Sequence, residues 1–376
     1  MKTIKIGLLG FGNMGRTHAY AVNNLPFFYK DLPFSAEIVV LFSSTPEKTQ
    51  KLCREFGFPV SATNEDELIN SSDVDVIDIC TPNIYHYDTL KKALLAGKHI
   101  YCEKPLCISA TQAKEIAELA QKSTSIHKIV FNNRYLPAVL RAKELVDEGK
   151  IGRILSFDAT YLHSSACSPL KNAGWKQNKD ICGGGVLFDL GSHVIDLIYH
   201  LCGAFESVCA TTQIAFPIRT GIDGKPWSTN ADEAFYMLTK LENGAVGTIR
   251  ASKITCGTND DLSFEIYGEK GAIRFSLMQP NFLQFYDNAL PENDLGGQRG
   301  FTHIETVARY SLPGGFFPSP KAPVGWLMGH VESYYNFLNS VHNGTQTHPS
   351  FTDAAYVQDV MEAAYRSAES GTWEKP

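Results

Sequence analysis

One lysine in the first third of the chain has the surroundings of a residue that moves a proton. Lys104 follows a short apolar run, residues 99–102, that is expected to form a strand, and Pro105 comes directly after it. An amine at a strand end can take or give a hydroxyl proton if its pKa falls from ~10.4 towards ~7–8. Burial and a nearby positive charge would both lower that pKa. Most lysines are solvated surface residues, so Lys104 needs supporting evidence from the rest of the chain.

A second candidate for proton chemistry combines a carboxylate with an imidazole. Asp189 and His193 follow the glycine run 183–185, within a segment of about 187–201 that is expected to form a helix. Residues four apart share one face of an α-helix, so these two side chains project the same way. Together they could hold a hydroxyl group and relay its proton, with Asp189 orienting His193 or binding a neighbouring hydroxyl. The alternative is an ordinary structural hydrogen bond, which is how we interpret the similarly spaced Asp196 and His200.

The element that could position such groups stands at the N-terminus. Residues 4–9 are an apolar, β-prone run, residues 16–22 are typical of a helix, and between them lies Gly10-Phe11-Gly12-Asn13-Met14-Gly15. G-x-G-x-x-G between a strand and a helix is the dinucleotide-binding fingerprint. Its glycines serve the tight turn, the approach of a pyrophosphate and the packing of the helix on the strand. Unpaired N–H groups of the first helical turn would face the phosphates. The alternative is a structural turn that binds nothing.

The end of the next expected strand, residues 37–42, bears on the identity of the dinucleotide. An acidic residue at this point binds the ribose hydroxyls and selects NAD. Here Ser43, Ser44 and Thr45 follow instead, so a 2′-phosphate would not be repelled, and Lys48 could reach it. This favours NADP weakly, because hydroxyl groups also bind a free ribose and Lys48 is equally consistent with a solvated helix residue. Both cofactors therefore stay open.

Strands and helices alternate up to about residue 130, with further strands expected at 74–80, 99–102 and 128–131. This alternation is typical of a doubly wound parallel sheet, whose ligands lie at the carboxyl ends of the strands. Gly97 is expected to end one helix, and Ser109 with Gln112 to form a capping box at the start of the next. Polar residues follow these strands at the positions where a cofactor would bind, namely Thr81, Asn83, Glu103, Lys104 and Asn132.

The pattern changes near residue 130. After a helix at about 137–148, strands are expected at 153–163, 208–216, 233–241, 246–252, 263–267 and 272–276. We therefore predict an α/β protein with a Rossmann domain, residues 1–130, and an α+β domain, residues 131–376, built on an open, mostly antiparallel sheet. A rim loop is expected at 25–34, a lid or oligomer contact at 296–325, and two closing helices at about 329–343 and 352–370.

The composition excludes several classes of protein. The chain has 376 residues, of which 44% are hydrophobic, enough for two or three domains with large cores. A net charge of −6 without long runs of one sign argues against nucleic acid or an anionic membrane as a partner. No apolar stretch of ~18 residues and no signal peptide are recognised, so we expect a cytoplasmic protein. The nine cysteines form no Cys-x-x-Cys and no close Cys/His pair, so no metal is expected.

Taken together, these motifs resemble the glucose–fructose oxidoreductase/inositol dehydrogenase (Gfo/Idh/MocA) family. The resemblance covers nearly the whole chain, and its motifs are residues 10–15, Thr81-Pro82-Asn83 with His86, Glu103-Lys104-Pro105, and 183–185 followed by Asp189 and His193. It implies a Rossmann domain with NAD(H) or NADP(H), and a second domain whose open sheet forms a homo-oligomer, a dimer or tetramer. It also implies hydride transfer at a secondary alcohol of a sugar, glycoside or cyclitol. Ser43 departs from the pattern, because many members have the acid there.

The resemblance also implies roles for single residues. Lys104 and His193 would handle the proton, Asp189 would assist at the substrate, and Pro82 and His86 would join the cofactor-binding set. Residues 325–332 are similar to a subgroup that acts on pyranose rings, the levoglucosan and glycoside 3-dehydrogenases. That similarity places Tyr161, Lys171 and Trp175 in the substrate pocket, where an aromatic face suits the C–H groups of a sugar. Core packing is the alternative for Trp175.

Three functional hypotheses follow from the sequence. The first is a sugar or cyclitol dehydrogenase, in which Lys104 and His193 from different halves of the chain converge beside C4 of the nicotinamide. The second is an NAD-dependent glycosidase, which oxidises a ring carbon transiently and releases the aglycone. The third is a non-catalytic nucleotide-binding sensor, which the presence of Lys104, Asp189 and His193 disfavours.

Overall fold

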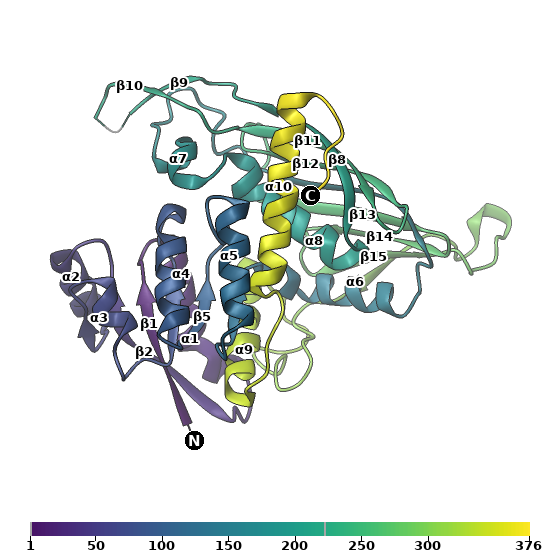
Figure 1. Cartoon of the computed structure of the whole chain (residues 1–376). Helices are drawn as coiled ribbons and strands as arrows, with labels where there is room; N and C mark the ends of the chain where they lie inside the picture. The colour runs from purple at the N-terminus through teal and green to yellow at the C-terminus, as the bar shows by residue number, and fades with distance from the viewer. Residues whose placement is uncertain (1, 222) are drawn as a thin grey trace. The chain divides into compact units, whose positions relative to one another are not determined.

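The computed structural model describes residues 2–221 and 223–376, and the chain divides into two compact units (Figure 1). The first comprises the chain up to Tyr135 together with Arg309–Ala355, and the second comprises Leu136–Ala308 and Tyr356–Pro376. The boundary at 135 lies close to the predicted one at 130. The C-terminal part differs from the prediction, because residues 309–355 group with the first unit rather than with the second.

The first unit is built on a six-stranded parallel sheet, as the alternation of strands and helices predicts. Its strand order is β3-β2-β1-β4-β5-β6, which is the order of a dinucleotide-binding fold. Strands β1 to β3 are added towards one edge of the sheet and β4 to β6 towards the other, so the order switches between β1 and β4. All four residues of β4 are buried, as expected for a strand covered on both faces. The strands are β1 (Lys2–Leu9), β2 (Phe34–Phe42), β3 (Val60–Ser61), β4 (Val76–Ile79), β5 (His99–Cys102) and β6 (His127–Ile129).

The helices of this unit begin largely where the sequence predicts. Thr45 and Ser109 accept hydrogen bonds from backbone N–H groups at the starts of α2 and α5. Only half of the predicted capping box forms, because Gln112 Oε1 has no hydrogen-bond partner among the described residues. The helices are α1 (Asn13–Phe28), α2 (Pro46–Phe56), α3 (Glu65–Ile69), α4 (His86–Leu95), α5 (Ala110–Gln121) and α9 (Trp326–Asn343), with 3₁₀ turns η1 (Asn83–Tyr85) and η2 (Asn132–Tyr135). In Figure 1, α4 and α5 lie side by side.

The predicted rim loop at 25–34 is too long at both ends. Helix α1 continues through Pro26 to Phe28, and β2 already begins at Phe34. Leu25, Tyr29 and Phe34 are each 3% exposed or less, because they face the core of the first unit. Tyr29 and Phe34 are therefore core residues, whereas Phe27 is exposed, and the true connection is only the few residues between α1 and β2.

Helix α9 returns to the first unit because its side chains complete that unit's core. It packs against α1, and Tyr335 stacks on Tyr29 with ring centroids 4.0 Å apart. Tyr334 is fully buried and donates to the carboxylate of Asp78 at 2.9 Å. The hydroxyl of Tyr101 in β5 donates to Ser333 Oγ at 2.9 Å. These long-range contacts have no local sequence signal, which is why a split of the chain at residue 130 did not anticipate them.

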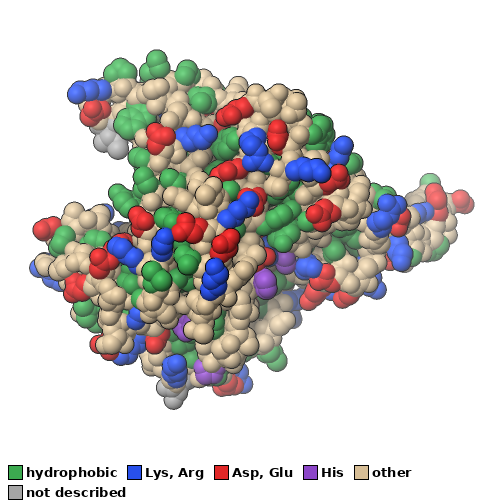
Figure 2. All heavy atoms as spheres, viewed as in Figure 1, with side chains coloured by type: hydrophobic (Ala, Val, Ile, Leu, Met, Phe, Trp, Pro, Cys, Tyr) green, Lys and Arg blue, Asp and Glu red, His purple; other side chains and the backbone are tan. Residues whose placement is uncertain are grey.

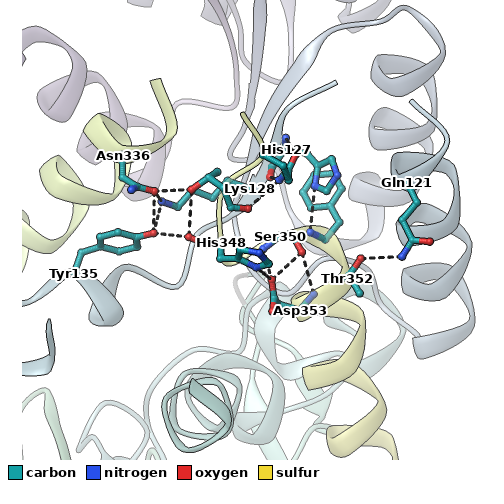
Figure 3. Close-up of polar contacts among 12 residues, drawn as sticks. Gln121, His127, Lys128, Tyr135, Asn336, His348, Ser350, Thr352 and Asp353 are labelled. Atoms are coloured by element: carbon teal, nitrogen blue, oxygen red, sulfur yellow. Dashed lines mark hydrogen bonds and ion pairs between the residues drawn. The ribbon is translucent and has the colours of Figure 1, made fainter. Parts of the chain in front are cut away.

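A buried lysine ties β6 to α9 (Figure 3). Lys128 is fully buried and donates to the Tyr135 hydroxyl, to the Ser333 carbonyl at 3.1 Å and to Asn336 Oδ1 at 2.6 Å. Burial lowers the pKa of Lys128 well below its ordinary value, and the charge of Glu332 opposes that shift. The Tyr135 hydroxyl in turn donates to the His348 carbonyl at 2.6 Å. The network thus joins β6 and η2 to α9 and to His348, with partners 205 and 213 residues apart in the sequence.

Lys128→Ala is expected to lower the free energy of unfolding by about 3 kcal/mol, because it leaves buried polar partners unpaired. Lys128→Met fills the same volume without a charge and is expected to cost less. Urea unfolding of both variants measures the difference, with Lys122→Ala as a matched control, since Lys122 is exposed at the end of α5. A Lys128→Ala protein as stable as the Lys122→Ala protein would contradict this role.

The second unit is built on an eight-stranded sheet with the order β16-β15-β14-β13-β7-β12-β11-β8. Neighbouring strands are antiparallel except for the parallel pair β7 and β12, so the prediction of a mostly antiparallel sheet is confirmed. The strands are β7 (Ile154–Leu162), β8 (Phe205–Gln213), β11 (Ala234–Leu241), β12 (Val246–Ser252), β13 (Asp261–Gly268), β14 (Gly271–Ser276), β15 (Phe282–Asp287) and β16 (Phe301–Glu305). A separate hairpin pairs β9 (Ile218–Thr220) with β10 (Pro226–Ser228).

Helices of the second unit cover one face of this sheet. Helix α8 contacts β7 and β12, and α6 contacts β14 and β15. Buried and exposed residues alternate strictly along most of β11, and Leu155, Tyr236, Leu238 and Val246 are exposed. The other face therefore stays open. The helical elements are α6 (Pro137–Asp147), η3 (Trp175–Gln177), α7 (Lys179–Cys182), η4 (Leu187–Gly191), α8 (Ser192–Cys202), η5 (Asp294–Gly296) and α10 (Phe351–Ser370). The boundary between the two units falls within α10, after Ala355.

The predicted lid or oligomer contact at 296–325 is partly a strand. Residues Phe301–Glu305 form β16, which pairs with β15 at the edge of the large sheet. Its sequence alternates weakly and it is short, so its strand signal is faint. Residues from Arg309 onward belong to the first unit. The segment is thus divided between the two units and does not act as one element.

One segment of the described residues, Lys179–Cys202, is long and apolar enough to cross a membrane by length and composition alone, with a mean hydropathy of 1.4. This differs from the expectation that the chain has no apolar stretch long enough to span a bilayer. Within its most apolar 18-residue stretch, 83% is buried inside the protein, as in the core helix of a folded domain.

The surface carries charges of both signs. On the face shown in Figure 2, Lys and Arg side chains are intermingled with Asp and Glu side chains.

Candidate active site

The glycine fingerprint has the geometry that its three glycines predict. Gly10 has φ +91°, and a Cβ on it would lie 2.6 Å from the Cys80 carbonyl oxygen. A Cβ on Gly15 would lie 2.2 Å from the Gly10 carbonyl oxygen. A Cβ on Gly12, in contrast, would meet no described atom within 4 Å. Gly10 and Gly15 are therefore needed by the fold itself, whereas Gly12 keeps space open above the helix.

The N-terminus of α1 is prepared for an anion. No side chain caps the helix at Gly12, and the first helical hydrogen bond is donated by Arg16 N to the Gly12 carbonyl at 3.1 Å. The preceding N–H groups, from Asn13 to Gly15, thus have no intrahelical acceptor and point out of the helix end. The Phe11 ring packs on Phe56 and Phe58. The part of Phe11 that a ligand could contact is therefore its backbone. These residues fit the pyrophosphate of a dinucleotide.

The residues after β2 divide into structural and exposed groups. Ser43 is buried, and its N–H donates to Thr49 Oγ1 at 2.9 Å. Thr45 caps α2. Ser44, with φ +58°, and Lys48 in the first turn of α2 are exposed. Ser44 and Lys48 are therefore the side chains of this set that remain available to a ribose or its 2′-phosphate.

The loop after β4 is held by a buried histidine. His86 is fully buried, and its ring nitrogens lie 2.9 Å from the Thr81 carbonyl and 2.9 Å from the Pro105 carbonyl. His86 therefore joins the two loops that follow β4 and β5, which is a positioning role rather than the direct cofactor contact expected for it. Thr81 Oγ1 is buried and has no hydrogen-bond partner among the described residues, so it can serve a ligand. Pro82 and Asn83 continue this loop into η1.

Lys104 stands beside a buried charge network. The Lys104–Pro105 bond is cis, and Lys104 N lies 3.3 Å from Glu103 Oε2. The other oxygen of Glu103 lies 3.1 Å from His18 Nε2, and His18 Nδ1 lies 2.8 Å from Asp78 Oδ1. Although burial lowers the pKa of His18, the Asp78 carboxylate raises it well above its ordinary value overall. His18 is thus an imidazolium that donates to both carboxylates and fixes the backbone next to Lys104.

A second buried histidine, His330 of α9, lies near this network. Its ring centroid is 6.1 Å from that of His18, and neither ring nitrogen has a hydrogen-bond partner among the described residues. Burial lowers the pKa of His330 well below its ordinary value, and the charges of His18 and Lys104 lower it further. His330 is therefore neutral. It was missed by sequence reasoning because nothing local connects residue 330 with residue 18.

His18, Glu103 and His330 could also hold a metal ion, since their ligand atoms all lie within 4.8 Å of one another. The charge balance favours the network without an ion. His18 uses both ring N–H groups on carboxylates, which leaves no lone pair for coordination. The absence of a metal stays a prediction.

Asn132 is the last cofactor candidate of the first unit. It begins η2 directly beyond β6 and is 3% exposed, and its amide donates to Asn133 Oδ1 at 3.4 Å. It therefore lies at the carboxyl edge of the sheet with Thr81 and Glu103, as the strand ends predict.

Asp189 and His193 do not lie on one regular α-helix. Residues Leu187–Gly191 form a π-helical turn, and the α-helix begins only at Ser192. This wider turn changes the angle between positions 189 and 193, so the four-residue spacing does not by itself place the two side chains on one face. Such π-turns are frequent at functional sites. Sequence periodicity could not reveal the turn, because its apolar pattern is that of a helix.

The glycine run before the turn is held by Asp232. Gly185 N and Leu187 N donate to the two carboxylate oxygens of Asp232 at 2.9 and 3.0 Å, and Tyr365 also donates to it. A Cβ on Gly185 would lie 2.1 Å from the Asp232 carbonyl oxygen. The Asp232 carboxylate thus sets where the π-turn begins, and only glycine fits beside it.

Asp189 of the π-turn and His193 of α8 lie among polar and aromatic side chains of the second unit. Asp189 forms ion pairs with Lys176 at 3.0 Å and Lys253 at 2.9 Å, two lysines that sequence reasoning did not select. His193 is 7% exposed, and its ring packs edge-to-face on Tyr161 at a centroid distance of 5.8 Å. The Tyr161 hydroxyl donates to Asp260 at 2.7 Å. Tyr161, Asp189 and His193 therefore belong to one cluster.

The other two substrate candidates lie in the segment between β7 and α7. Lys171 is exposed and donates to the Ser165 carbonyl. Trp175 begins η3 and is 39% exposed, so it is not a core residue and core packing does not explain it. The ammonium group of Lys176 lies 5.7 Å from the centre of the Trp175 ring.

Comparisons with known proteins agree with these observations. Residues 4–131 match the family model described as oxidoreductase family, NAD-binding Rossmann fold, and residues 139–274 match the GFO/IDH/MocA C-terminal domain. The chain is 31% identical to levoglucosan dehydrogenase of Pseudarthrobacter phenanthrenivorans, over 99% of this chain and 98% of that protein. It is 26% identical to glucose-6-phosphate 3-dehydrogenase of Bacillus subtilis, over 95% and 94%.

A solved structure of levoglucosan dehydrogenase in complex with NADH and levoglucosan is similar over 100% of this chain and 99% of that chain, with a TM-score of 0.94 and 31% sequence identity. The predicted fold class is thus confirmed. The chain belongs to the GFO/IDH/MocA family of oxidoreductases, with an NAD-binding Rossmann fold at its N-terminus.

Proposed function

We propose that this oxidoreductase transfers a hydride between a secondary alcohol of a sugar, glycoside or cyclitol and a nicotinamide cofactor. The observation that carries the proposal is the placement of Lys104. It directly follows β5, which lies in the same parallel sheet as β1, so Lys104 and the glycine fingerprint share the carboxyl edge of that sheet. Relatives named for the oxidation of levoglucosan and glucose 6-phosphate support a carbohydrate substrate.

The chain's own residues bind the reactants and handle the proton. When bound, the nicotinamide ring exchanges the hydride with the carbinol carbon. Lys104 or His193 takes the hydroxyl proton during oxidation and returns it during reduction. Asp189 binds a neighbouring hydroxyl, and its two lysine partners hold the carboxylate in position. Tyr161, Lys171 and Trp175 line the substrate side, where the exposed Trp175 ring offers a face to sugar C–H groups.

A panel of sugars, glycosides and cyclitols tests this function, with each dinucleotide supplied separately. The expected result is a rise in the reduced-nicotinamide absorbance band with at least one alcohol. Release of an aglycone without net reduction of the cofactor would support the transient-oxidation glycosidase instead. Dinucleotide binding without any reaction across the panel would support the non-catalytic sensor.

The protein uses NAD(H), and Lys48 would allow it to bind NADP(H) as well. Lys48→Ala is expected to weaken NADP binding about tenfold and NAD binding less than twofold, because only NADP carries the 2′-phosphate that the ammonium group would meet. Titration with each dinucleotide measures the two affinities. Lys51→Ala, an exposed lysine on the same helix, is the matched control. An equal loss for both dinucleotides would rule out this role.

The open face of the large sheet is the surface through which the protein would form a homo-oligomer. Its exposed apolar residues include Leu155 in β7, Tyr236 and Leu238 in β11, and Val246 in β12. A sheet face of this kind favours association with a second copy. Light scattering on the purified protein measures the mass, with a dimer or tetramer as the expected result.

A further inference from the structure

One buried arginine of the second unit is hydrogen-bonded to two other segments of the chain. The side chains of Arg219, in β9, and Glu233, just before β11, are 1% and 4% exposed. Nε and Nη2 of Arg219 donate to the same oxygen of Glu233, at 3.1 and 2.5 Å. Nη2 also donates to the Ala166 carbonyl and Nη1 to the Ser168 carbonyl, each at 2.8 Å. These bonds use four of the five N–H donors of the guanidinium group, so its position is fixed.

Glu233 extends these contacts to two further segments. Its second carboxylate oxygen accepts from the N–H groups of residues 215–216, at 3.0 Å each, on the chain that leads into the hairpin β9–β10. Its backbone carbonyl accepts from Lys253 N at 2.8 Å. The ammonium group of Lys253 is in turn paired with Asp189 at 2.9 Å. The Arg219–Glu233 pair is therefore bonded to the backbone of a residue that contacts Asp189.

The segment between β7 and α7 depends on these contacts because it has little structure of its own. Apart from the short turn η3, residues 163–178 form no helix or strand in the part of the chain that the structure describes. Arg219 holds two carbonyls of this segment before Lys171. After Lys171, Ala173 N donates to a carbonyl of β9 at 2.7 Å, two residues before Trp175. The segment is thus bonded to the hairpin on both sides of Lys171.

Stability alone does not explain an ion pair at this place. A buried pair of charges loses its hydration, and apolar side chains of the same volume are often at least as stabilising. Apolar side chains, however, cannot hold two carbonyl groups and two N–H groups in fixed positions. The pair of Arg219 and Glu233 therefore supplies geometry, and the segments whose geometry it fixes carry residues of the proposed substrate side.

We propose that Arg219, held by Glu233, is a positioning residue for the substrate, because it fixes the segment that carries Lys171 and Trp175 against the hairpin β9–β10. This inference rests on the proposed function, which assigns that segment to the sugar. Arg219 acts through the backbone of the segment and not on the reacting atoms. Loosening this anchor therefore weakens the binding of the sugar and leaves the chemical step nearly unchanged once the sugar is bound.

Hydrogen–deuterium exchange of Arg219→Lys tests the anchoring. A lysine keeps the positive charge beside Glu233, but a single ammonium group cannot reproduce the planar fork that reaches both carbonyls. Exchange is expected to become about tenfold faster in peptides that cover residues 164–178. Arg153→Lys is the matched control, because Nε and Nη2 of Arg153 also donate to one oxygen of a glutamate, Glu269, in an exposed pair. Exchange in the control is expected to match the wild type.

Sugar binding and turnover measure the functional consequence. Glucose, levoglucosan and myo-inositol serve as probes, and each is titrated into the enzyme with bound dinucleotide. For a probe that binds the wild type, Arg219→Lys is expected to raise Kd and KM about tenfold and to keep kcat within about threefold. Its affinity for the dinucleotide is expected to stay within about twofold, because the contacts of Arg219 all lie in the second unit. Arg153→Lys is expected to match the wild type in each measurement.

A merely structural role predicts a different pattern. Arg219→Lys would then have a lower Tm and a smaller active fraction, so kcat would fall while KM and the exchange of residues 164–178 kept their wild-type values. That pattern overturns the inference, and so does faster exchange with unchanged sugar affinity. If Arg219→Lys does not fold, the double variant Arg219→Met/Glu233→Gln takes its place with the same expected results, since it leaves no unpaired charge buried.

The inference and the proposed function fail in different ways. Turnover by the wild type, with an unchanged KM in Arg219→Lys, would leave the dehydrogenase function standing and remove the positioning role. Binding of a probe that Arg219→Lys weakens, without any reduction of the cofactor by the wild type, would support the positioning role and remove the proposed reaction.

Discussion

Lys104→Ala is expected to lower kcat by about 10³-fold while the affinity for the dinucleotide changes less than threefold. A positioned acid or base contributes about 10²–10⁴-fold to a proton transfer. We expect the dinucleotide to bind at the glycine fingerprint and the N-terminus of α1, which follow β1, whereas Lys104 follows β5. The loss should therefore appear in the chemical step and not in cofactor binding.

Steady-state kinetics and fluorescence titration of the dinucleotide measure the two quantities for Lys104→Ala. Lys98→Ala is the matched control, since Lys98 precedes the same strand at its other end and donates to the carbonyls of Ser71 and Val74. That variant is expected to lose some stability and to retain kcat. Full activity of the Lys104→Ala enzyme would remove the lysine from the mechanism.

Gly12→Val is expected to leave the fold intact and to weaken dinucleotide binding about 100-fold, which corresponds to about 2.8 kcal/mol. Gly12 has φ −83°, which any residue adopts, and a Cβ there meets no described atom within 4 Å. The new side chain would occupy the space that a pyrophosphate needs above the N-terminus of α1. Thermal unfolding without ligand and titration with dinucleotide measure the two effects.

Gly15→Ala is expected to have the opposite effect, because it destabilises the fold instead of blocking the cofactor site. A Cβ on Gly15 would lie 2.2 Å from the Gly10 carbonyl oxygen, so the helix must move away from the strand. The free energy of unfolding is expected to fall by about 3 kcal/mol, the upper range for an overpacked site. If Gly12→Val bound the dinucleotide as the wild type does, the open space at Gly12 would not be the cofactor site.

The sequence predicts the first unit well because its signals are local. Strand ends, Gly97 and the cap at Ser109 are each encoded within a few residues. The fingerprint is also a short-range pattern, and the φ of Gly10 and the close approach at Gly15 agree with the reason for each glycine. The parallel strand order follows from the alternation of strands and helices.

The parts that the sequence did not predict depend on contacts between distant segments. The return of α9 to the first unit requires Tyr334 to meet Asp78, which stands 256 residues earlier. Asp78 in an apolar strand was nevertheless a usable signal, because a buried carboxylate needs partners. The imidazolium of His18 and the hydroxyl of Tyr334 are those partners.

The geometry around Asp189 and His193 was not predicted from the sequence. Asp189 and His193 were selected for an α-helical spacing, yet a π-turn lies between the glycine run and α8. Lys176 and Lys253 were not selected, because isolated lysines carry no pattern and only the fold brings them to Asp189.

We propose that Lys104 and His193 both take part in the proton transfer, and a double-mutant cycle on kcat/KM tests this proposal most directly. The measurement compares Lys104→Ala, His193→Ala and the double variant with the wild type, using the best substrate of the panel. Residues that act as a unit show strongly non-additive losses. We predict that the double variant is no more than about threefold slower than the slower single variant. The account would be contradicted if the loss in the double variant equalled the product of the two single-variant losses, or if the His193→Ala enzyme had wild-type activity.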